Sequence, residues 1–356
     1  MVPESPAMPF ERIGIVGCGL IGTSLGLALH RIGVDALLQD ALPEHIEQAI
    51  ALGAGQRWLP DQTVDCIVVA VPPGATRSVL DAMASAYPQA TLTDVASVKS
   101  GIEQGATSVK RRLVPGHPMA GRELSGPQAA RADLFDDRLW ILTPLPETDA
   151  HRTAAMHALV RLVGAVPVTM TVAEHDQAVA LVSHTPQVLA SILAAQLRDA
   201  NTDHVAIAGQ GLRDMTRIAA SNVDLWTDIL TANAEPIDSV LASVQNDIAS
   251  LRSALRGDPA GVAAILRAGV RGHQAIPGKH GSSASTYIEI PVMVEDRPGQ
   301  LAALLVAAGE AEINLEDVRI EHVLGRPSGL IELSVRPEHG PALIAVLRSR
   351  GFDVRV

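Results

Sequence analysis

IGIVGCGLIGTSLGLALHRIGVDALLQD, residues 13–40, is the stretch that decides the fold. A strand-like apolar run, Ile13–Val16, leads into the pattern Gly-x-Gly-x-x-Gly, and a helix-like apolar segment follows. The first glycine of this pattern allows a tight turn, the second lets the backbone approach a pyrophosphate, and the third lets the helix pack on the strand. The helix N-terminus then stabilises the phosphate charge. The stretch predicts dinucleotide binding rather than a structural glycine turn, with the phosphates at Gly17, Gly19, Leu20, Ile21 and Gly22.

Asp40 lies at the end of the second apolar run of this stretch. An acidic residue here suits hydrogen bonds to the adenosine ribose hydroxyls, which favours NAD as the cofactor. No Arg or Lys follows Asp40 immediately to bind the 2′-phosphate of NADP. The alternative is an ordinary solvated carboxylate at a strand end. We expect Val71 and Pro72, where a later apolar run ends, to complete the cofactor site.

The composition is that of a folded protein that does not bind nucleic acid. The 356-residue chain is 47% apolar, and its net charge is -11. Acidic charge and few aromatic residues (3 Trp, 2 Tyr and 3 Phe) argue against nucleic-acid partners. The 2 cysteines form neither a disulfide framework nor a metal-ligand pattern, so we expect no metal and a reducing cytoplasm. No export signal is seen and no apolar run reaches about 18 residues, so we expect no membrane span.

The order of apolar runs divides the chain into domains. Short runs alternating with helical ones predict an α/β Rossmann-type domain with a doubly wound parallel sheet over residues 9–171. Apolar residues at three- and four-residue spacing then predict an all-helical domain over 172–275. A helical segment that follows a nucleotide-binding domain commonly supplies one wall of the active site and a subunit interface, so we expect a substrate and dimerisation domain here. The Gly- and Ser-rich residues 276–285 are interpreted as a linker. The strands expected in the first domain are Ile13–Val16, Ala36–Gln39, Cys66–Val71, Thr91–Val95, Leu139–Thr143 and Val166–Thr171.

Residues 286–356 have the pattern of a compact α+β domain with the order βαββαβ. The segment resembles an ACT domain, the amino-acid-sensing module of biosynthetic enzymes, on DRPGQLA (296–302) and on Ile313-Asn314-Leu315. Gly299 suits the close approach of a ligand or a neighbouring subunit, or simply a strand-to-helix turn. The resemblance implies a tyrosine or phenylalanine effector and feedback regulation.

Three further clusters carry residues suited to chemistry. They are TDVASVK (93–99), GHPMAG (116–121) and, in the helical part, SHTPQ (183–187) with GLRDMTRIA (211–219), Trp226-Thr227-Asp228 and Asn233. The first lies at the carboxyl end of an expected strand, where open α/β sheets bind ligands. Together with the glycine loop, these clusters resemble the prephenate and arogenate dehydrogenase family of tyrosine biosynthesis. The resemblance covers essentially the whole chain when the ACT-like tail is included.

Oxidation of a ring alcohol requires a group that takes the hydroxyl proton as hydride leaves for nicotinamide. His117 suits this role, because an imidazole near its ordinary pKa is present in both its protonated and its neutral form near physiological pH. The family's catalytic histidine lies in the same motif; the alternative is a histidine that satisfies loop carbonyls. Ser97 matches a family serine that hydrogen-bonds the imidazole or the substrate hydroxyl, and a helix N-cap is a nearly equal alternative. Lys99 is interpreted as a solvated charge.

The substrate that the resemblance implies carries two carboxylates, so cationic anchors are needed. Arg213 and Arg217 are spaced i and i+4 on an expected helix and would face the same way. Arg217 matches the family's substrate-binding arginine, whereas we expect a surface ion pair for Arg213. Ser183 and His184 match the family's substrate region, although a histidine in an apolar helix is otherwise a core residue. The family frequently has a second histidine where Gln187 stands, so a proton-relay role is not carried over to it.

Arg122 bears on the choice between the two substrates. Prephenate presents a keto acid, whereas arogenate presents an ammonium group that an arginine would repel. Arg122 therefore favours prephenate, while the neighbouring Glu123 would favour arogenate.

The resemblance thus implies an NAD-dependent, homodimeric prephenate dehydrogenase that converts prephenate to 4-hydroxyphenylpyruvate. Arogenate dehydrogenase is the first alternative. A β-hydroxyacid dehydrogenase shares the plan, but its glycine-flanked catalytic lysine is not found in the sequence. A regulatory protein that senses NAD and an amino acid is disfavoured by His117, Ser97 and Arg217 together, because a sensor needs no base.

Overall fold

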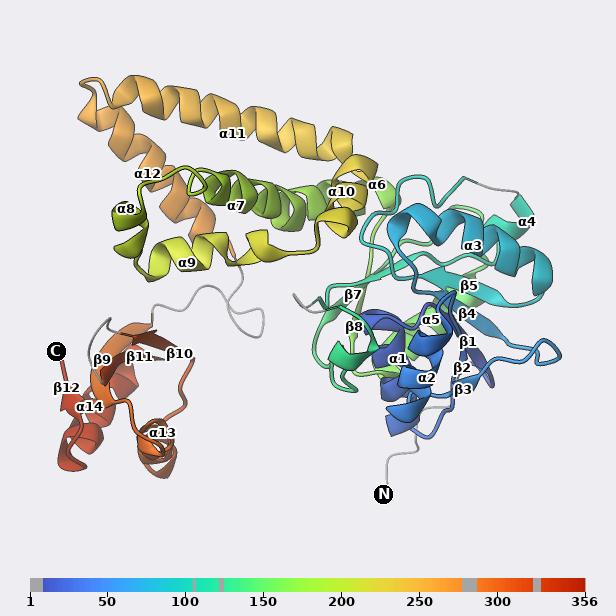
Figure 1. The fold of residues 1–356 in the computed structure, drawn as a ribbon, viewed down its shortest axis with the longest axis horizontal. Helices are drawn as coiled ribbons and strands as arrows, with labels where there is room; N and C mark the ends of the chain where they lie inside the picture. The colour runs from blue at the N-terminus through green and yellow to red at the C-terminus, as the bar shows by residue number, and fades with distance from the viewer. Residues whose placement is uncertain (1–8, 105–106, 122–124, 277–286, 323–327, 356) are drawn as a thin grey trace. The chain divides into compact units, whose positions relative to one another are not determined.

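The computed structural model describes residues 9–104, 107–121, 125–276, 287–322 and 328–355. The chain forms two compact units that divide between Gln245 and Asn246. The first unit contains the glycine loop and the polar clusters, and the second contains the C-terminal sheet (Figure 1).

A five-stranded sheet forms the centre of the α/β part of the first unit (Figure 1). All its pairings are parallel. The strand order β3-β2-β1-β4-β5 is that of a Rossmann dinucleotide-binding fold, whose ligands bind at the carboxyl ends of the strands where the order reverses. The strands are β1 (Ile13–Val16), β2 (Leu37–Gln39), β3 (Gln56–Arg57), β4 (Cys66–Val69) and β5 (Thr91–Asp94).

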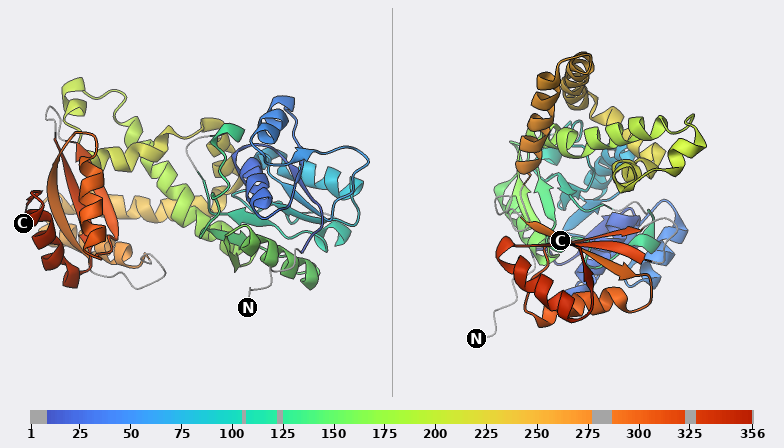
Figure 2. Two further views of the ribbon diagram at one scale, coloured as in Figure 1. Left: turned by 90° about the horizontal axis from the view of Figure 1, so that it is seen from below. Right: turned by 90° about the vertical axis from the view of Figure 1, so that its left-hand side faces the viewer.

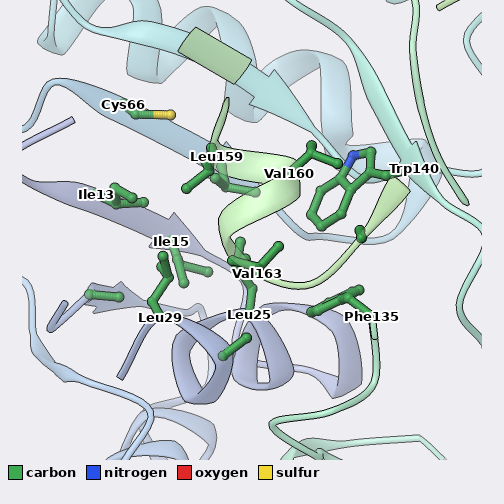
Figure 3. Packing of buried hydrophobic residues seen from close by; sticks show 14 of the residues in the cluster. Ile13, Ile15, Leu25, Leu29, Cys66, Phe135, Trp140, Leu159, Val160 and Val163 are labelled. Carbon is green, nitrogen blue, oxygen red and sulfur yellow. The ribbon is translucent and has the colours of Figure 1, made fainter. Parts of the chain in front are cut away.

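Helices cover both faces of this sheet, because its strands are apolar on both sides. On one face, Ile13 and Ile15 pack with Leu25 and Leu29 of α1 (Leu20–Arg31) (Figure 3). Side chains of α2 (Pro43–Ala51) and α5 (Ala150–Leu162) complete that core. On the other face, Ile67 and Val69 pack with α3 (Pro73–Ala86).

The rest of the α/β region forms a separate three-stranded sheet, so the prediction of a single doubly wound sheet is wrong here. β7 (Leu139–Leu142) pairs antiparallel with β6 (Gly116–Pro118) and parallel with β8 (Val166–Thr169). Pro115 and Pro118 donate no backbone hydrogen bond, which disfavours a regular sixth strand beside β5. Only an isolated parallel bridge, Leu92 to Leu113, extends the large sheet within the described residues.

From Val172 onward the first unit is helical, as predicted. Pro186 lacks a backbone donor, which accounts for the wider π-helical turn just before it. The elements are α6 (Val172–Val179), the π-helical turn (Ala180–His184), α7 (Thr185–Ala195), α8 (Thr202–Ala206), α9 (Gln210–Thr216), a 3-10 turn (Arg217–Ala220), α10 (Val223–Ala232) and α11 (Ala234–Ala254), whose end belongs to the second unit.

One continuous helix in the described residues, Val172–Ala195, is long and apolar enough to cross a membrane, with a mean hydropathy of 1.5. The apolar run is not unbroken, because His175, Asp176 and His184 interrupt it. All three are buried. Because ionisable side chains are costly in lipid and these are hydrogen-bonded inside the unit, we interpret the helix as part of the folded unit rather than as a membrane span.

The second unit contains α12 (Pro259–Gln274) and a four-stranded antiparallel sheet, seen edge-on in Figure 2. The predicted βαββαβ order is confirmed by its elements, and the strand order is β10-β11-β9-β12. α13 and α14 pack against β9 and each other. Most of the predicted linker, residues 277–285, lies outside the described residues. The elements are β9 (Ile288–Glu295), α13 (Gln300–Glu310), β10 (Asp317–His322), β11 (Ser328–Val335), α14 (Gly340–Ser349) and β12 (Asp353–Val354).

Candidate active site

The three glycines of the loop after β1 have different surroundings. Gly17 has φ +105°, and a Cβ there would lie 2.3 Å from the Ala70 carbonyl oxygen. A Cβ at Gly22 would lie 1.9 Å from the Gly17 carbonyl oxygen, so this position allows no side chain. A Cβ at Gly19 would meet no atom within 4 Å. The first and third glycines are thus required by the fold, whereas the second faces open space.

The N-terminus of α1 opens on that space. Gly19 is its N-cap residue, makes no side-chain cap, and no acidic residue occupies the first turn. The first backbone N–H groups of a helix have no partner within it, and they carry partial positive charge. Val71 and Pro72 follow β4 at the same edge of the sheet, with Pro72 capping α3. This arrangement suits an anionic ligand.

The Asp40 carboxylate is tied to the glycine loop rather than simply solvated. One oxygen accepts from the Cys18 N–H at 2.5 Å, and the other from the Leu42 N–H at 2.8 Å. The side chain is 11% exposed. Its position at the end of β2 is the one that hydrogen-bonds a ribose in dinucleotide sites.

His117 ends a chain of hydrogen bonds that begins at the start of α6. Its Nδ1 lies 2.9 Å from His175 Nε2, and His175 Nδ1 lies 2.7 Å from Asp176 Oδ1. The Asp176 carboxylate also accepts from the N–H groups of Lys99 and Ser100, at 2.9 and 2.7 Å, and from the Ser100 hydroxyl. His175 and Asp176 are both buried. Neither was selected from the sequence.

The helix that carries this pair is fixed at its first turn. Thr171 and Glu174 form a reciprocal capping box, in which each side chain bonds the other's backbone N–H. This motif satisfies two N–H groups that a helix start leaves unpaired. It therefore holds the His175-Asp176 dipeptide against the loop after β5. The only sequence signal was an adjacent His-Asp pair just inside a helix start.

Lys99 is fully buried, which corrects its interpretation as a solvated charge. Its ammonium forms an ion pair with the buried Asp94 and donates to the Gly116 carbonyl at 2.5 Å. Asp94 also accepts from the N–H groups of Ala96, at 2.9 Å, and Gly116, at 3.3 Å. Asp94 at the end of β5 and Lys99 in the loop after it therefore hold the residue that precedes His117.

The pKa of His117 lies well below its usual value of 6.5. Burial is the main cause, and the neighbouring His175, Lys99 and His184 act in the same direction, whereas Asp176 opposes them. The expectation of a half-protonated imidazole is therefore wrong, because the ring is neutral at physiological pH. Hydrogen bonds from His175 and Ser100 outweigh the effect of burial and lower the pKa of Asp176, which stays ionised.

His184, in the π-helical turn, is buried beside the same aspartate. The Asn233 amide nitrogen lies 3.0 Å from His184 Nδ1 and donates to the Asp176 backbone carbonyl at 2.9 Å. The edge of the ring meets Trp226 at a centroid distance of 6.0 Å. Burial lowers the pKa of His184 to about 4.

The remaining predicted site residues take no part in the hydrogen bonds described above. Within the described ranges the Ser97 hydroxyl makes no hydrogen bond, and no helix begins between Ser97 and Thr107, so the N-cap alternative is wrong. Ser183 is half-buried in the π-helical turn, and Gln187 is buried and contacts Ser191 at 3.4 Å. Arg122 and Glu123 lie outside the described residues.

The two arginines predicted on one helix do not share a regular helix. α9 ends at Thr216, so Arg213 lies in its last turn while Arg217 begins the 3-10 turn. Both side chains are exposed.

Open space also lies next to the residues that follow β6. A cavity of about 370 Å³ is lined by Met119, Ala120, Gly121, Arg131, Asp133, Leu134, Asp136 and Arg138. In the part of the chain that is described, no three His, Cys, Asp or Glu side chains are grouped to hold a metal ion.

Comparisons with known proteins agree with this architecture. Residues 25–169 match the nucleotide-binding domain of prephenate dehydrogenase, and residues 171–266 match its dimerization domain. A probable prephenate dehydrogenase of Streptomyces niveus is 35% identical over 94% of this chain and 97% of its own length. A prephenate dehydrogenase of Bacillus subtilis is 26% identical over 92% of this chain and 93% of its own.

Solved structures give the same result. Prephenate dehydrogenase from Aquifex aeolicus, in complex with hydroxyphenyl propionate and NAD+, has a TM-score of 0.69 at 26% identity, covering 76% of this chain and 99% of that one. Synechocystis arogenate dehydrogenase has a TM-score of 0.64 at 26% identity, covering 74% and 100%. With both domains matched in order, and a relative similar along nearly its whole length, this chain belongs to the prephenate dehydrogenase family.

Proposed function

We propose that this chain is an NAD-dependent prephenate dehydrogenase that oxidatively decarboxylates prephenate to 4-hydroxyphenylpyruvate in tyrosine biosynthesis. The observation that carries the proposal is the neutral, hydrogen-bonded His117 of β6, whose neighbour Gly116 is bound by Asp94 at the carboxyl end of β5 in the Rossmann-type sheet. A base with a low pKa is available to take a proton at physiological pH. The names of the relatives supply the substrate class.

The residues present fit NAD. The N-terminus of α1, with open space at Gly19, would hold the pyrophosphate, and Asp40 would hold the adenosine ribose. Leu20, Ile21 and Gly22 would donate backbone N–H groups, and Val71 and Pro72 would line the opposite wall. When bound, NAD accepts the hydride. Asp40 favours NAD over NADP, since its carboxylate would repel a 2′-phosphate.

In the proposed mechanism, His117 Nε2 takes the proton of the ring hydroxyl as hydride leaves the ring carbon that bears this hydroxyl. Ser97 lies within the same loop as Lys99 and would hydrogen-bond that hydroxyl. Carbon dioxide leaves as the ring becomes aromatic. Aromatisation drives the step, so the protein mainly has to position and polarise the substrate.

The substrate's two carboxylates need cationic or polar anchors. Arg217 takes one carboxylate, and His184 and Ser183 line the same region. Arg122 favours the keto acid of prephenate over the ammonium of arogenate. Arogenate dehydrogenase is the second candidate, because the Synechocystis structure and a cyclohexadienyl dehydrogenase of Zymomonas mobilis, 32% identical over 62% of this chain and 80% of its own, are also similar.

We further propose that the βαββαβ domain is an ACT-like regulatory domain for tyrosine or phenylalanine. Its element order and the left-handed Gly299 (φ +88°) at the start of α13 support this assignment. The proposed division is 9–171 for NAD, 172–275 for substrate and dimerisation, and 286–356 for regulation. A homodimer is supported by the family name of residues 171–266 and by exposed Leu181, Val182 and Ile192. A cytoplasmic location suits such an enzyme.

The test is NADH formation by the purified chain with prephenate and, separately, arogenate, each with and without tyrosine. Turnover of prephenate supports the proposal, and inhibition by tyrosine supports the regulatory domain. Turnover of arogenate alone contradicts the Arg122 argument. If the wild-type chain binds NAD but oxidises neither substrate, the sensor alternative is favoured.

A variant tests the role of the proposed base. His117→Asn should bind NAD normally and lose turnover.

A further inference from the structure

Asp176 lies between the two histidines that the proposed function places at the substrate. Its side chain contacts His175, which contacts His117, and its backbone carbonyl accepts from Asn233, which contacts His184. We propose that Asp176 acts as a positioning residue that fixes these histidines in opposite tautomers, His117 with its proton on Nδ1 and His184 with its proton on Nε2. The inference rests on the proposed function only for its catalytic consequence.

The side-chain branch is the route from the Asp176 carboxylate through His175 to His117. The proton positions along it follow from the donors around the carboxylate. Asp176 accepts from the Lys99 N–H, the Ser100 N–H and the Ser100 hydroxyl, so it is surrounded by donors and stays ionised. An ionised carboxylate can only accept. His175 Nδ1 must therefore carry a proton that it donates to Asp176 Oδ1.

The neutral form of His175 completes this branch. With its proton on Nδ1, the ring presents Nε2 as an acceptor, and the hydrogen bond to His117 requires that His117 Nδ1 donates. Donation from both ring nitrogens of His175 would reverse that bond and would place a second buried cation beside His117, which already faces the Lys99 ammonium. The groups facing His117 are His175 and Asp176 of α6, Lys99 with its partner Asp94, and His184.

The backbone branch follows from the orientation of the Asn233 amide. Its nitrogen donates to the Asp176 carbonyl at 2.9 Å, and a rotated amide would place its oxygen against that carbonyl oxygen. The same nitrogen lies 3.0 Å from His184 Nδ1, which must then accept. The Asn233 oxygen is buried without a partner in the described structure, so nothing there favours the rotated form. In neutral His184 the proton is therefore on Nε2.

These tautomers give the two rings different chemical roles. His117 leaves Nε2 free to accept the substrate hydroxyl proton, and the imidazolium that forms keeps its Nδ1–H on His175. Through that bond the Asp176 carboxylate stabilises the new positive charge. His184 can only donate through Nε2, which suits a carboxylate or carbonyl oxygen of the substrate. Asp176 thus makes His117 a base and His184 a hydrogen-bond donor.

The direct test is nitrogen-15 solid-state NMR of the full-length protein with labelled histidine, at pH 8 and without substrate. The chain has 12 histidines, so His117→Asn and His184→Asn variants assign the two signals. We expect protonation at Nδ1 for His117 and at Nε2 for His184. The opposite tautomer at either ring overturns the proposal for that branch, whether or not the protein oxidises prephenate.

Two variants serve as controls for each other. In Asn233→Ala, His184 should no longer be held in one tautomer, while the tautomer of His117 stays unchanged. In His175→Phe, His117 should no longer be held in one tautomer, while that of His184 stays unchanged. If His175→Phe does not fold, the wild-type spectrum remains decisive. An unchanged His117 tautomer in folded His175→Phe would overturn the role of Asp176.

A kinetic comparison tests the catalytic consequence. In His175→Gln the amide oxygen can still accept from His117 Nδ1, whereas in His175→Asn the shorter side chain reaches only Asp176. We expect His175→Asn to lower kcat by about 10²- to 10⁴-fold with little change in KM, and His175→Gln to recover much of the loss. Equal losses would contradict the positioning role. Correct tautomers without prephenate turnover would instead refute the proposed function.

Discussion

The Lys99 ammonium pairs with the Asp94 carboxylate in the interior of the first unit, where both side chains are 0% exposed. The pair also binds the backbone of Gly116 on both sides, through the Gly116 carbonyl and N–H. Since His117 is the next residue, the position of the proposed base depends on this ion pair. A buried pair of this kind stabilises a fold only while it is complete.

Replacing Lys99 by Met should destabilise the first unit strongly. The substitution leaves the Asp94 carboxylate buried without its cation, which typically costs about 3–5 kcal/mol of unfolding free energy. Chemical denaturation followed by circular dichroism measures this loss. A Lys99→Met, Asp94→Asn double variant should recover part of it, because the second change removes the unpaired charge.

The matched control is an ion pair on the surface. Arg198 and Asp199 are paired at 2.7 Å, but their side chains are 79% and 77% exposed. Because water screens such a pair, Arg198→Ala should leave the unfolding transition at its wild-type position. A Lys99→Met variant as stable as Arg198→Ala would show that Lys99 is not buried as described.

Alanine at Gly19 and at Gly22 should both weaken NAD binding, but only the second should lower stability. The Cβ at Gly19 meets no atom within 4 Å and its φ is -77°, so Gly19→Ala should fold with wild-type stability. The methyl group would nevertheless occupy the space where a pyrophosphate approaches, so NAD binding should weaken at least about tenfold. Calorimetric titration with NAD measures this change.

At Gly22 the added Cβ would lie 1.9 Å from the Gly17 carbonyl oxygen. Gly22→Ala should therefore lower the melting temperature as well as NAD affinity, because α1 must move away from β1. Loss of stability in Gly19→Ala, or a fully stable Gly22→Ala, would contradict the roles that the structure gives the two glycines.

The glycine loop could be predicted from the sequence because its determinants are local. Gly17 needs a positive φ, and Gly22 needs close packing within one strand–turn–helix unit, so the spacing alone is informative. The C-terminal strand pattern was predictable for the same reason: in β9, the alternating residues Ile290, Val292 and Val294 are buried.

The chain from Asp176 to His117 could not be predicted, because it joins residues far apart in sequence. Whether Lys99 is solvated or buried depends on Asp94 and on Gly116, which a second sheet brings to it. His175 resembles any surface histidine until α6 packs on the loop after β5. The lowered pKa of His117 follows from that packing, so a motif-based estimate fails there.

Arg217 should matter for substrate affinity, and Arg213 should not. A charge-assisted arginine–carboxylate bond corresponds to roughly a 10- to 150-fold change in binding. We therefore expect Arg217→Ala to raise the KM for prephenate by that factor, with the KM for NAD unchanged. Arg213→Ala removes the same charge four residues away and serves as the control. Equal effects of the two variants would indicate a general electrostatic attraction rather than a specific anchor.

Catalysis should persist at mildly acidic pH. His117 acts as a base only when neutral, and burial together with His175, Lys99 and His184 lowers its pKa well below 6.5. The ring therefore remains neutral as the pH falls from 8 to 6.5, and kcat/KM for prephenate, measured with saturating NAD, should stay nearly constant over that range. Activity should then fall below pH 6.5 as the proton binds at Nε2. Circular dichroism at each pH excludes unfolding as the cause, and a midpoint at or above pH 6.5 would show that the free enzyme does not hold His117 in its neutral form.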